Sequence, residues 1–323
     1  MENERKCYVV TGTAGFLGSH LTEALLAKGH SVLGWDNFET GLEENMSSFR
    51  NHKDFTFINK DFSDVDEVND MIAMLGFKKI KIDGMFMVGA RARIQPSISN
   101  PSRTFACNVI GTFNLLEFCR ALDIKNVVYS GSSSMYGAGT LPNKPDDKDE
   151  CLNPYSSTKL LGEKLCKTWH KCYGINCVVL RYFNIYGPRS QLSGGYAPVI
   201  GNFFMQRLRE KKPMTIVGTG EQRRDLTYVA DVVDANILAM ENCERVTGKT
   251  FNVGTGKNYS VNQIAELIGG QTTFIPPRPA ELEATLADIT ETTAELGWIP
   301  KVSLEEGIEL ARKHYTELFK NEQ

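Results

Sequence analysis

The chain has 323 residues, of which 41% are hydrophobic and 23% charged, and its formal net charge is −3. This length and composition indicate a folded globular protein with one large α/β domain or two unequal lobes. The small net charge gives no electrostatic reason to expect nucleic acid or an anionic membrane as a partner, and no stretch approaches the ~18 apolar residues of a membrane span.

Eight cysteines are scattered along the chain, none in a C-x-x-C pair, and the five histidines do not cluster with them. This pattern predicts free thiols, with no disulfide and no metal site. The amino-terminal segment MENERKCYVV turns apolar only briefly and lacks the apolar core of a signal peptide. We therefore expect a cytoplasmic protein.

The first half of the chain alternates short apolar runs with amphipathic stretches. Strands are predicted at 6–10, 30–36, 54–61, 82–90, 125–131 and 175–183, and helices at 16–28, 64–75, 102–121 and 155–172. This order is typical of βαβ units, which build a parallel sheet with helices on both faces. After about residue 187 a Gly/Pro/Ser-rich loop introduces shorter elements. The predicted fold is therefore α/β: a Rossmann-type doubly wound parallel sheet with a smaller C-terminal α/β lobe.

Three glycines separate the first predicted strand from the first helix. Gly12, Gly15 and Gly18 lie in the segment YVVTGTAGFLGSHL with the spacing G-x-x-G-x-x-G. Glycines at such a junction let the backbone turn sharply and approach a pyrophosphate, which the helix amino terminus then faces. Phe16 and Leu17 start that helix. We expect these five residues to bind a dinucleotide.

An acidic residue ends the second predicted strand. A carboxylate at Asp36, 18 residues after Gly18, would bind a ribose 2′-OH and repel a 2′-phosphate, which favours NAD over NADP. No arginine follows in the same turn, and Asn37 comes next. The alternative is an Asp that merely forms the turn. Asp61 and Phe62 follow the third strand and could frame the adenine.

A tyrosine and a lysine share one face of the predicted helix 155–172. Tyr155 and Lys159 are spaced i, i+4 in NPYSSTKLLGE. A free tyrosine is a poor base at pH 7, but a neighbouring ammonium and the positive nicotinamide of NAD+ favour its phenolate. The pair therefore predicts a base for a sugar or alcohol hydroxyl. The alternative is an exposed tyrosine on a helix surface.

Taken together, TGTAGFLGSHL, NVIGTFNLLE, YSGSSSMYG, YSSTK and RYFNIYGPR resemble motifs of the extended short-chain dehydrogenase/reductase family. Within it, the chain is similar to the nucleotide-sugar 4-epimerases, from about residue 6 to 318. The family's catalytic triad implies Ser132 as the hydroxyl residue beside Tyr155 and Lys159. In the implied mechanism, Tyr155 takes the proton of the sugar 4-OH, C4 gives its hydride to NAD+, and the hydride returns to the other face of the 4-keto sugar.

Relatives that dehydrate or decarboxylate the sugar carry acidic residues directly after the hydroxyl residue, because they need a further acid and base. Here Ser133 and Ser134 occupy those positions. This favours a 4-epimerase acting on UDP-Glc/UDP-Gal, on UDP-GlcNAc/UDP-GalNAc, or on both. The alternatives are a UDP-glucuronate 4-epimerase, a 4,6-dehydratase, and a non-catalytic NAD-binding sensor.

The resemblance implies further site residues. Gly89 and Ala90 leave room for the cofactor after the fourth strand, and Tyr182 packs near the nicotinamide. Thr285 walls the sugar pocket, and because it is small the pocket can admit an N-acetyl group. The residues implied in substrate binding are Ser97, Ser132, Ser133, Tyr155, Asn184, Val199, Arg224 and Arg278.

Some residues depart from the family pattern. Met87 stands where relatives usually have His, and Val217 where an aromatic residue often packs near the uracil. Arg91 and Arg93 could meet a sugar carboxylate, although phosphate binding or surface ion pairs are the simpler interpretation.

The expected organisation is an NAD-binding domain at 1–186, with returning segments near 225–256, and a mainly substrate-binding lobe at 187–323. The resemblance also implies a homodimer, in which the helices at about 102–121 and 155–172 form a four-helix bundle.

Overall fold

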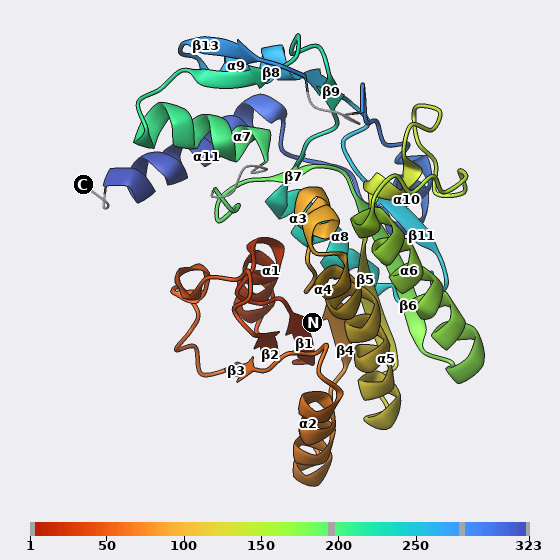
Figure 1. Cartoon of the computed structure of the whole chain (residues 1–323). Coiled ribbons are helices and arrows are strands. Elements are labelled where there is room, and N and C mark those ends of the chain that lie inside the picture. The colour runs from red at the N-terminus through yellow and green to blue at the C-terminus, as the bar shows by residue number, and fades with distance from the viewer. Residues whose placement is uncertain (1–3, 193–197, 278–281, 321–323) are drawn as a thin grey trace. The chain divides into compact units, whose positions relative to one another are not determined.

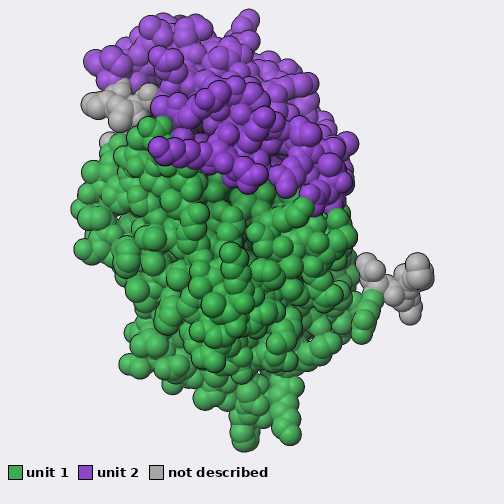
Figure 2. Space-filling model, turned by 90° about the vertical axis from the view of Figure 1, so that its right-hand side faces the viewer, with its two compact units in different colours: residues 1–135, 149–181, 233–251 green, residues 136–148, 182–232, 252–323 purple. Residues whose placement is uncertain are grey.

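The computed structural model describes residues 4–192, 198–277 and 282–320. The chain divides into two compact units, coloured separately in Figure 2. The first unit holds residues 1–135, 149–181 and 233–251, and the second holds 136–148, 182–232 and 252–323. Each unit is therefore assembled from segments that are far apart in the sequence.

A seven-stranded sheet dominates the first unit, with the strand order β11-β6-β5-β4-β1-β2-β3 (Figure 1). The strands are β1 (Cys7–Thr11), β2 (Ser31–Asp36), β3 (Phe55–Asn59), β4 (Gly84–Met87), β5 (Asn126–Ser132), β6 (Asn176–Tyr182) and β11 (Thr250–Val253). Strand β1 pairs in parallel with β2 and β4, β2 with β3, and β4 with β5. The carboxyl ends of these strands therefore share one edge of the sheet.

The helices connect the strands by crossovers in two directions. They are α1 (Phe16–Ala27), α2 (Val65–Lys78), α3 (Ile94–Ser99), α4 (Pro101–Phe105), α5 (Gly111–Ala121), α6 (Pro154–Tyr173) and α8 (Val229–Glu241). From β1 the chain moves to β2 and β3, and it then returns past β1 to β4, β5 and β6. Because crossovers are right-handed, α1 lies on one face of the sheet and α2, α5 and α6 on the other. The predicted doubly wound α/β class is confirmed.

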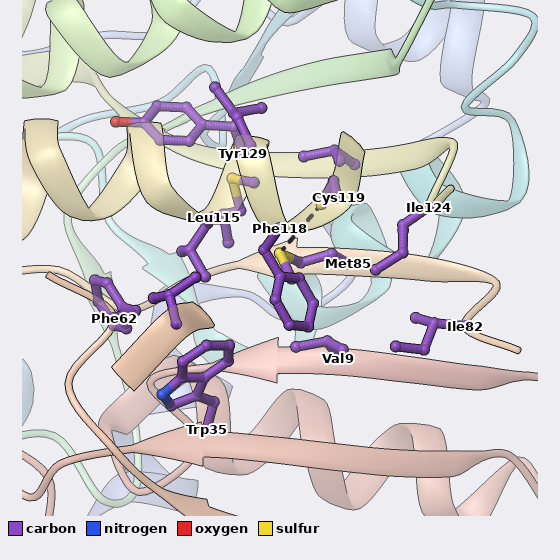
Figure 3. Close-up of a cluster of buried hydrophobic side chains, with 14 of the residues drawn as sticks. Val9, Trp35, Phe62, Ile82, Met85, Leu115, Phe118, Cys119, Ile124 and Tyr129 are labelled. Atoms are coloured by element: carbon purple, nitrogen blue, oxygen red, sulfur yellow. Dashed lines mark hydrogen bonds between the residues drawn. The ribbon is translucent and has the colours of Figure 1, made fainter. Parts of the chain in front are cut away.

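A continuous apolar core lies between the sheet and helices α2, α5 and α6 (Figure 3). Trp35 of β2 and Phe118 of α5 meet edge to face, with ring centroids 5.4 Å apart, and the Cys119 thiol contacts the sulfur of Met85. Such aromatic pairs contribute about 0.5–1.5 kcal/mol beyond their buried area. Met87 is buried in the same cluster, so the side chain that replaces the usual histidine packs as an ordinary core residue.

The predicted strands and helices of this unit are all found, with differences in detail. The helix expected at 102–121 begins at Pro101 and contains a π-helical turn, η2, at Ala106–Ile110. The helix α3 and the 3₁₀ turns η1 (Glu43–Met46) and η3 (Ser133–Tyr136) were not predicted, nor were α8 and β11, for which only returning segments near 225–256 were expected. The α3, η1 and η3 segments are short, and their sequences show no amphipathic period.

The second unit consists of short strands and helices, an α/β lobe as predicted. Its elements are β7 (Ile185–Tyr186), α7 (Val199–Phe204), the π-helical turn η4 (Met205–Arg209), β8 (Met214–Val217), β9 (Arg223–Arg224), β10 (Thr227–Tyr228), β12 (Tyr259–Ser260), α9 (Val261–Ile268), β13 (Thr272–Ile275), α10 (Thr290–Leu296) and α11 (Leu304–Lys320). The strands form three two-stranded sheets: β10-β7, β12-β9 and β13-β8.

No helix in residues 4–192, 198–277 or 282–320 combines the length and the apolar character needed to cross a membrane.

Candidate active site

The three glycines form a tight cradle after β1. Gly12 has a left-handed φ of +72°, and a Cβ there would lie 2.7 Å from the Gly89 Cα. A Cβ on Gly18 would lie 2.0 Å from the Gly12 carbonyl oxygen, so no side chain fits at position 18 in the first turn of α1. The N–H of Gly15 donates to that same oxygen at 2.9 Å. The cradle therefore brings bare backbone to the junction of β1 and α1.

The amino terminus of α1 has no cap of its own. Gly15 is the N-cap residue and offers no side chain, and no acidic residue lies in the first turn. The backbone amides that begin a helix need an acceptor, and a phosphate provides one. Phe16 and Leu17 lie in this first turn, as expected. The site thus has the geometry of a diphosphate-binding turn.

Asp36 is held firmly at the end of β2. Its side chain is 6% exposed and accepts hydrogen bonds from the N–H groups of Ala14 (3.0 Å) and Phe38 (2.8 Å). Burial raises the pKa of Asp36, and these backbone hydrogen bonds oppose the rise. The carboxylate thereby ties Ala14, which lies between the first two glycines of the cradle, to the loop after β2. Asn37 follows it and turns the chain by accepting the N–H of Glu39.

The next two strands bring Phe62 and Gly89 together. The Phe62 ring lies so near Gly89 that a Cβ on the glycine would be 2.8 Å from it. The N–H of Gly89 donates to Thr11 Oγ1 at 3.0 Å, and Ala90 follows, partly buried. Asp61 precedes Phe62 and accepts from Arg103. The predicted adenine-framing residues and the glycine cradle therefore share one edge of the sheet.

Tyr155 lies in the first turn of α6. Asn153 caps the helix, and the N–H of Tyr155 donates to Ser97 Oγ at 3.0 Å. Burial raises the pKa of Tyr155, and the nearby hydroxyl of Ser132, the last residue of β5, opposes the rise. The positive charge of a bound NAD+ would lower the pKa of Tyr155 further.

Lys159 follows one turn later and is 4% exposed. Its Nζ donates to the Ser130 carbonyl at 2.9 Å and lies 5.2 Å from the centre of the Tyr129 ring. Burial lowers the pKa of Lys159 to about 8, so its ammonium is protonated at pH 7 but loses its proton readily above that. The structure therefore brings Ser132, Tyr155 and Lys159 to the carboxyl end of β5.

The other two serines are not equivalent to Ser132. Ser134 donates its N–H to Ser132 Oγ at 3.2 Å, and the two hydroxyls are 2.9 Å apart. Ser134 thus holds the Ser132 hydroxyl in place. Ser133 is partly buried within η3.

In the second unit, Asn184 and Thr285 are directly linked. The Asn184 Nδ2 donates to Thr285 Oγ1 at 3.0 Å and to the Asp225 carbonyl at 2.9 Å. Thr285 Oγ1 also accepts the N–H of Asp225 at 3.2 Å. Asn184 adopts a positive φ of 27°, which is unusual outside glycine. The predicted diphosphate contact and sugar-pocket wall are therefore one hydrogen-bonded set.

The remaining substrate-lobe predictions are placed as follows. Arg224 is partly buried, and its Nη1 donates to the carbonyls of Arg223 and Leu282, both at 2.9 Å. Val199 begins α7, and Tyr182 ends β6; both are partly buried. Arg278 lies outside the described residues.

Asn108 was missed by the sequence analysis. It sits in the π-helical turn η2 and binds both the N–H (2.8 Å) and the carbonyl (3.2 Å) of Arg91. Its Nδ2 also donates to Thr158 Oγ1 at 3.0 Å, next to Lys159. Asn108 thereby joins the loop after β4 to the catalytic helix. The motif NVIGTFNLLE contains it, but only the family resemblance, and no local period, marked that motif.

The fold brings two arginines to the turn after β2, although the sequence has none within that turn. Arg91 and Arg103 both pair with Glu39 there. Arg91 therefore forms an ion pair with a carboxylate of the protein, in agreement with the simpler interpretation of this residue.

The fold and site define a Rossmann-type protein with a diphosphate-binding cradle and a Tyr155–Lys159 pair at the carboxyl ends of its strands. A model of the NAD dependent epimerase/dehydratase family matches residues 8–254. The chain belongs to this family, and the family's cofactor is NAD. The cradle fits that group, since the bare glycine backbone, the uncapped helix start and Asp36 match a diphosphate followed by a ribose.

Several individual proteins that the chain resembles are UDP-sugar 4-epimerases. The chain is 34% identical to the UDP-glucuronate 4-epimerase of Thermodesulfobacterium geofontis over 310 residues, covering 93% of each chain. It is also 34% identical to the UDP-glucose 4-epimerase of Mycolicibacterium smegmatis over 310 residues, covering 93% of this chain and 95% of that one. Among solved structures, the UDP-N-acetylglucosamine 4-epimerase from Methanobrevibacter ruminantium M1 superposes with a TM-score of 0.90 at 31% identity, covering 97% of this chain and 99% of the other.

Proposed function

We propose that the chain is an NAD-dependent UDP-sugar 4-epimerase. The observation that carries this proposal is the position of the Tyr155 phenol near the Ser132 hydroxyl at the carboxyl end of β5, with Lys159 buried one helical turn away and bound to the Ser130 carbonyl. The first unit binds NAD, and the second supplies Asn184, Thr285, Val199 and Arg224 to the nucleotide sugar. Family membership and the three 4-epimerase relatives support the same reaction.

Each residue of the site has a role in the proposed reaction that follows from its chemistry. The glycine cradle and Asp36 would hold NAD, which would supply an acceptor for the hydride of sugar C4 and its return to the opposite face of that carbon. Tyr155 Oη takes the proton from the 4-OH and later gives it back. The Ser132 hydroxyl orients the sugar oxygen toward Tyr155. Lys159 supplies the positive charge that favours the phenolate, and Ser97 fixes the backbone of Tyr155 through its N–H.

The acids near this helix support epimerisation over dehydration. Glu163 lies one turn beyond Lys159, but it is fully buried and its oxygens are bound by Arg181 (3.0 and 3.1 Å) and Lys167 (2.8 Å). Burial alone would raise the pKa of Glu163, yet these two cations hold it below its usual range. It therefore cannot serve as the extra acid that loss of the 6-OH requires, and neither can Ser133 or Ser134.

For the sugar, we propose a neutral hexose, either UDP-Glc/UDP-Gal or UDP-GlcNAc/UDP-GalNAc. Thr285 is small enough to leave space for an N-acetyl group. The glucuronate alternative gains nothing from Arg91, because that guanidinium already pairs with Glu39.

The proposal is tested with three substrates in parallel. UDP-Glc, UDP-GlcNAc and UDP-GlcA are each incubated with the protein, and the anomeric region is followed by NMR. We expect inversion at C4 of at least one neutral sugar. Tyr155→Phe should keep its NAD and lose turnover by about 10²–10⁴-fold. Binding of NAD without inversion of any substrate would instead indicate a sensor, and a 4-keto-6-deoxy product would indicate a dehydratase.

The predicted homodimer has a candidate surface in the first unit. Phe105, Ile110, Phe113 and Leu161 are each 41–45% exposed on α4, η2, α5 and α6. Two of these residues, Phe105 and Leu161, also line a largely apolar groove of about 530 Å³ together with Pro154. We propose that a second copy covers this surface by pairing the same helices into a four-helix bundle. Leu161→Glu should halve the mass measured by light scattering, whereas Leu42→Glu, at an exposed position in the loop after β2, should not.

We also propose that the protein works in the cytoplasm. All eight of its cysteines are free thiols, five of them buried, which suits a reducing compartment.

A further inference from the structure

Four charged side chains form a continuous chain of ion pairs at the carboxyl ends of the strands. Arg103 of α4 donates from Nη2 to Glu39 Oε2 and to Asp61 Oδ2, both at 2.6 Å. Its Nε contacts both Glu39 oxygens at 3.1 Å, and its Nη1 donates to Ser63 Oγ at 2.8 Å. Arg91 forms an ion pair with Glu39 from the other side. One guanidinium thus ties two carboxylates together, and one carboxylate ties two guanidinium groups.

The strand order decides what this network spans. Glu39 follows β2 and Arg91 follows β4, and β1 lies between those two strands. The ion pair between them therefore crosses the carboxyl end of β1, where the glycine cradle begins. On the other side, Arg103 connects the same Glu39 to Asp61, which follows β3. The network therefore links the loops that follow β4, β2 and β3, next to the cradle, Asp36 and Phe62.

The charges balance within the network. Burial alone would raise the pKa of Glu39 and of Asp61, but the arginine contacts, together with Ser63 at Asp61, hold both pKa values below the usual range. Both carboxylates are therefore ionised at neutral pH and neutralise the two arginines. The four side chains are 20–28% exposed, so added salt reaches and weakens these pairs.

We propose that Glu39, Arg91, Arg103 and Asp61 form an ionic clasp that closes the adenosine end of the cofactor site and slows the release of NAD. NAD lying on the cradle with its ribose at Asp36 lies beneath the Glu39–Arg91 pair, which has to part before the cofactor leaves. Retention matters for an enzyme whose cofactor ends each turnover unchanged. The clasp residues are positioning residues, because none of them touches the reacting atoms of the sugar.

The test follows release of the cofactor without any sugar. Protein loaded with NADH is mixed with excess NAD+, and the fall of bound-NADH fluorescence gives the release rate. We expect Glu39→Gln and Arg103→Met to release NADH about fivefold faster than the wild type, as the loss of one or two partly exposed ion pairs implies. Added salt should accelerate the wild type and leave Glu39→Gln, which lacks the Glu39–Arg91 pair, nearly unchanged.

The matched control is Arg5→Met. Arg5 pairs with Asp54 at 2.5 Å at the opposite, amino-terminal edge of the same sheet. It should release NADH at the wild-type rate. The clasp is overturned if Arg103→Met and Arg5→Met release NADH equally fast, even where both lower the melting temperature. Because no sugar is present, this result is independent of whether the protein inverts C4.

Discussion

The hydroxyl of Ser132, the last residue of β5, lies close enough to the phenol of Tyr155, in the first turn of α6, to lower the pKa of Tyr155 against the raising effect of burial. The two groups come from separate elements, and each is fixed independently. Tyr155 is held by Ser97 through its backbone N–H, and Ser132 by the N–H and hydroxyl of Ser134. The base and its partner therefore need no rearrangement of α6 or β5 to meet a sugar hydroxyl.

Removing the Ser132 hydroxyl should move the pH profile of the enzyme. Burial raises the pKa of Tyr155, and the nearby Ser132 hydroxyl lowers it. Tyr155 acts as a base when deprotonated, so in Ser132→Ala the rising limb of kcat shifts to higher pH, and kcat at pH 7 falls by about 10²-fold. Ser132→Thr keeps the hydroxyl and should keep the wild-type limb. A profile for Ser132→Ala that is merely scaled down would contradict this role.

Replacing Lys159 should stabilise the folded chain. Burial lowers the pKa of this lysine from 10.5 to about 8, so below pH 8 the folded state bears the cost of a buried charge, on the order of 3 kcal/mol. Between pH 8 and 10.5 the unfolded chain binds more protons than the folded chain, and this penalty disappears as the pH rises. Lys159→Met should therefore have a higher free energy of unfolding than the wild type at pH 7. The expected difference is about 2 kcal/mol, because the lost hydrogen bond to Ser130 offsets part of the gain.

Urea unfolding of the NAD-free proteins at pH 7 and pH 10 measures this difference. The advantage of Lys159→Met should shrink at pH 10, while its turnover is poor at both pH values. Lys78→Met, at the exposed end of α2, provides the control and should track the wild type. An advantage that is the same at both pH values would show that the effect comes from packing and not from charge.

Neutralising Glu163 should destabilise the first unit severely. Its carboxylate accepts from Arg181, Lys167 and, at 3.0 Å, from Thr250 Oγ1. Glu163→Gln leaves the buried Arg181 charge without its main counter-ion, which costs about 3–5 kcal/mol of unfolding free energy. The double variant Glu163→Gln/Arg181→Met removes that charge and should recover part of the loss. By comparison, Glu117→Gln breaks a more exposed pair with Arg120 and should cost under about 1 kcal/mol.

How much the sequence could predict depends on the distance between partners. Tyr155 and Lys159 are four residues apart on one helix, so their shared face followed from helical geometry alone. The boundaries of β5 and α6 were predicted to within one residue, because apolar periodicity and the Asn153-Pro154 start are local signals. The glycine cradle was likewise contained in a single segment.

The clasp could not have been predicted in this way. Glu39 and Arg103 are 64 residues apart, and only the return of the chain past β1 to β4 brings their loops together. The same holds for Asn108, whose π-helical turn has no local sequence signature but binds the backbone of Arg91. Long-range polar contacts of this kind depend on the topology of the chain. The hydrophobic pattern of the sequence predicts only the fold class, not these contacts.

The last prediction concerns Thr285 and the binding of the nucleotide sugar. Its Oγ1 accepts from the Asn184 side chain and from the Asp225 N–H, so it fixes the amide proposed to bind the diphosphate. Thr285→Val has a similar shape but no acceptor, and the loss of a hydrogen bond worth about 1 kcal/mol should raise KM about fivefold and leave kcat unchanged. Thr285→Ser retains the oxygen and should restore KM, and Thr273→Val on the exposed strand β13 should have no effect. Because Asn184 takes no part in the hydride or proton steps, a fall in kcat at constant KM would place Thr285 beside the reacting carbon instead.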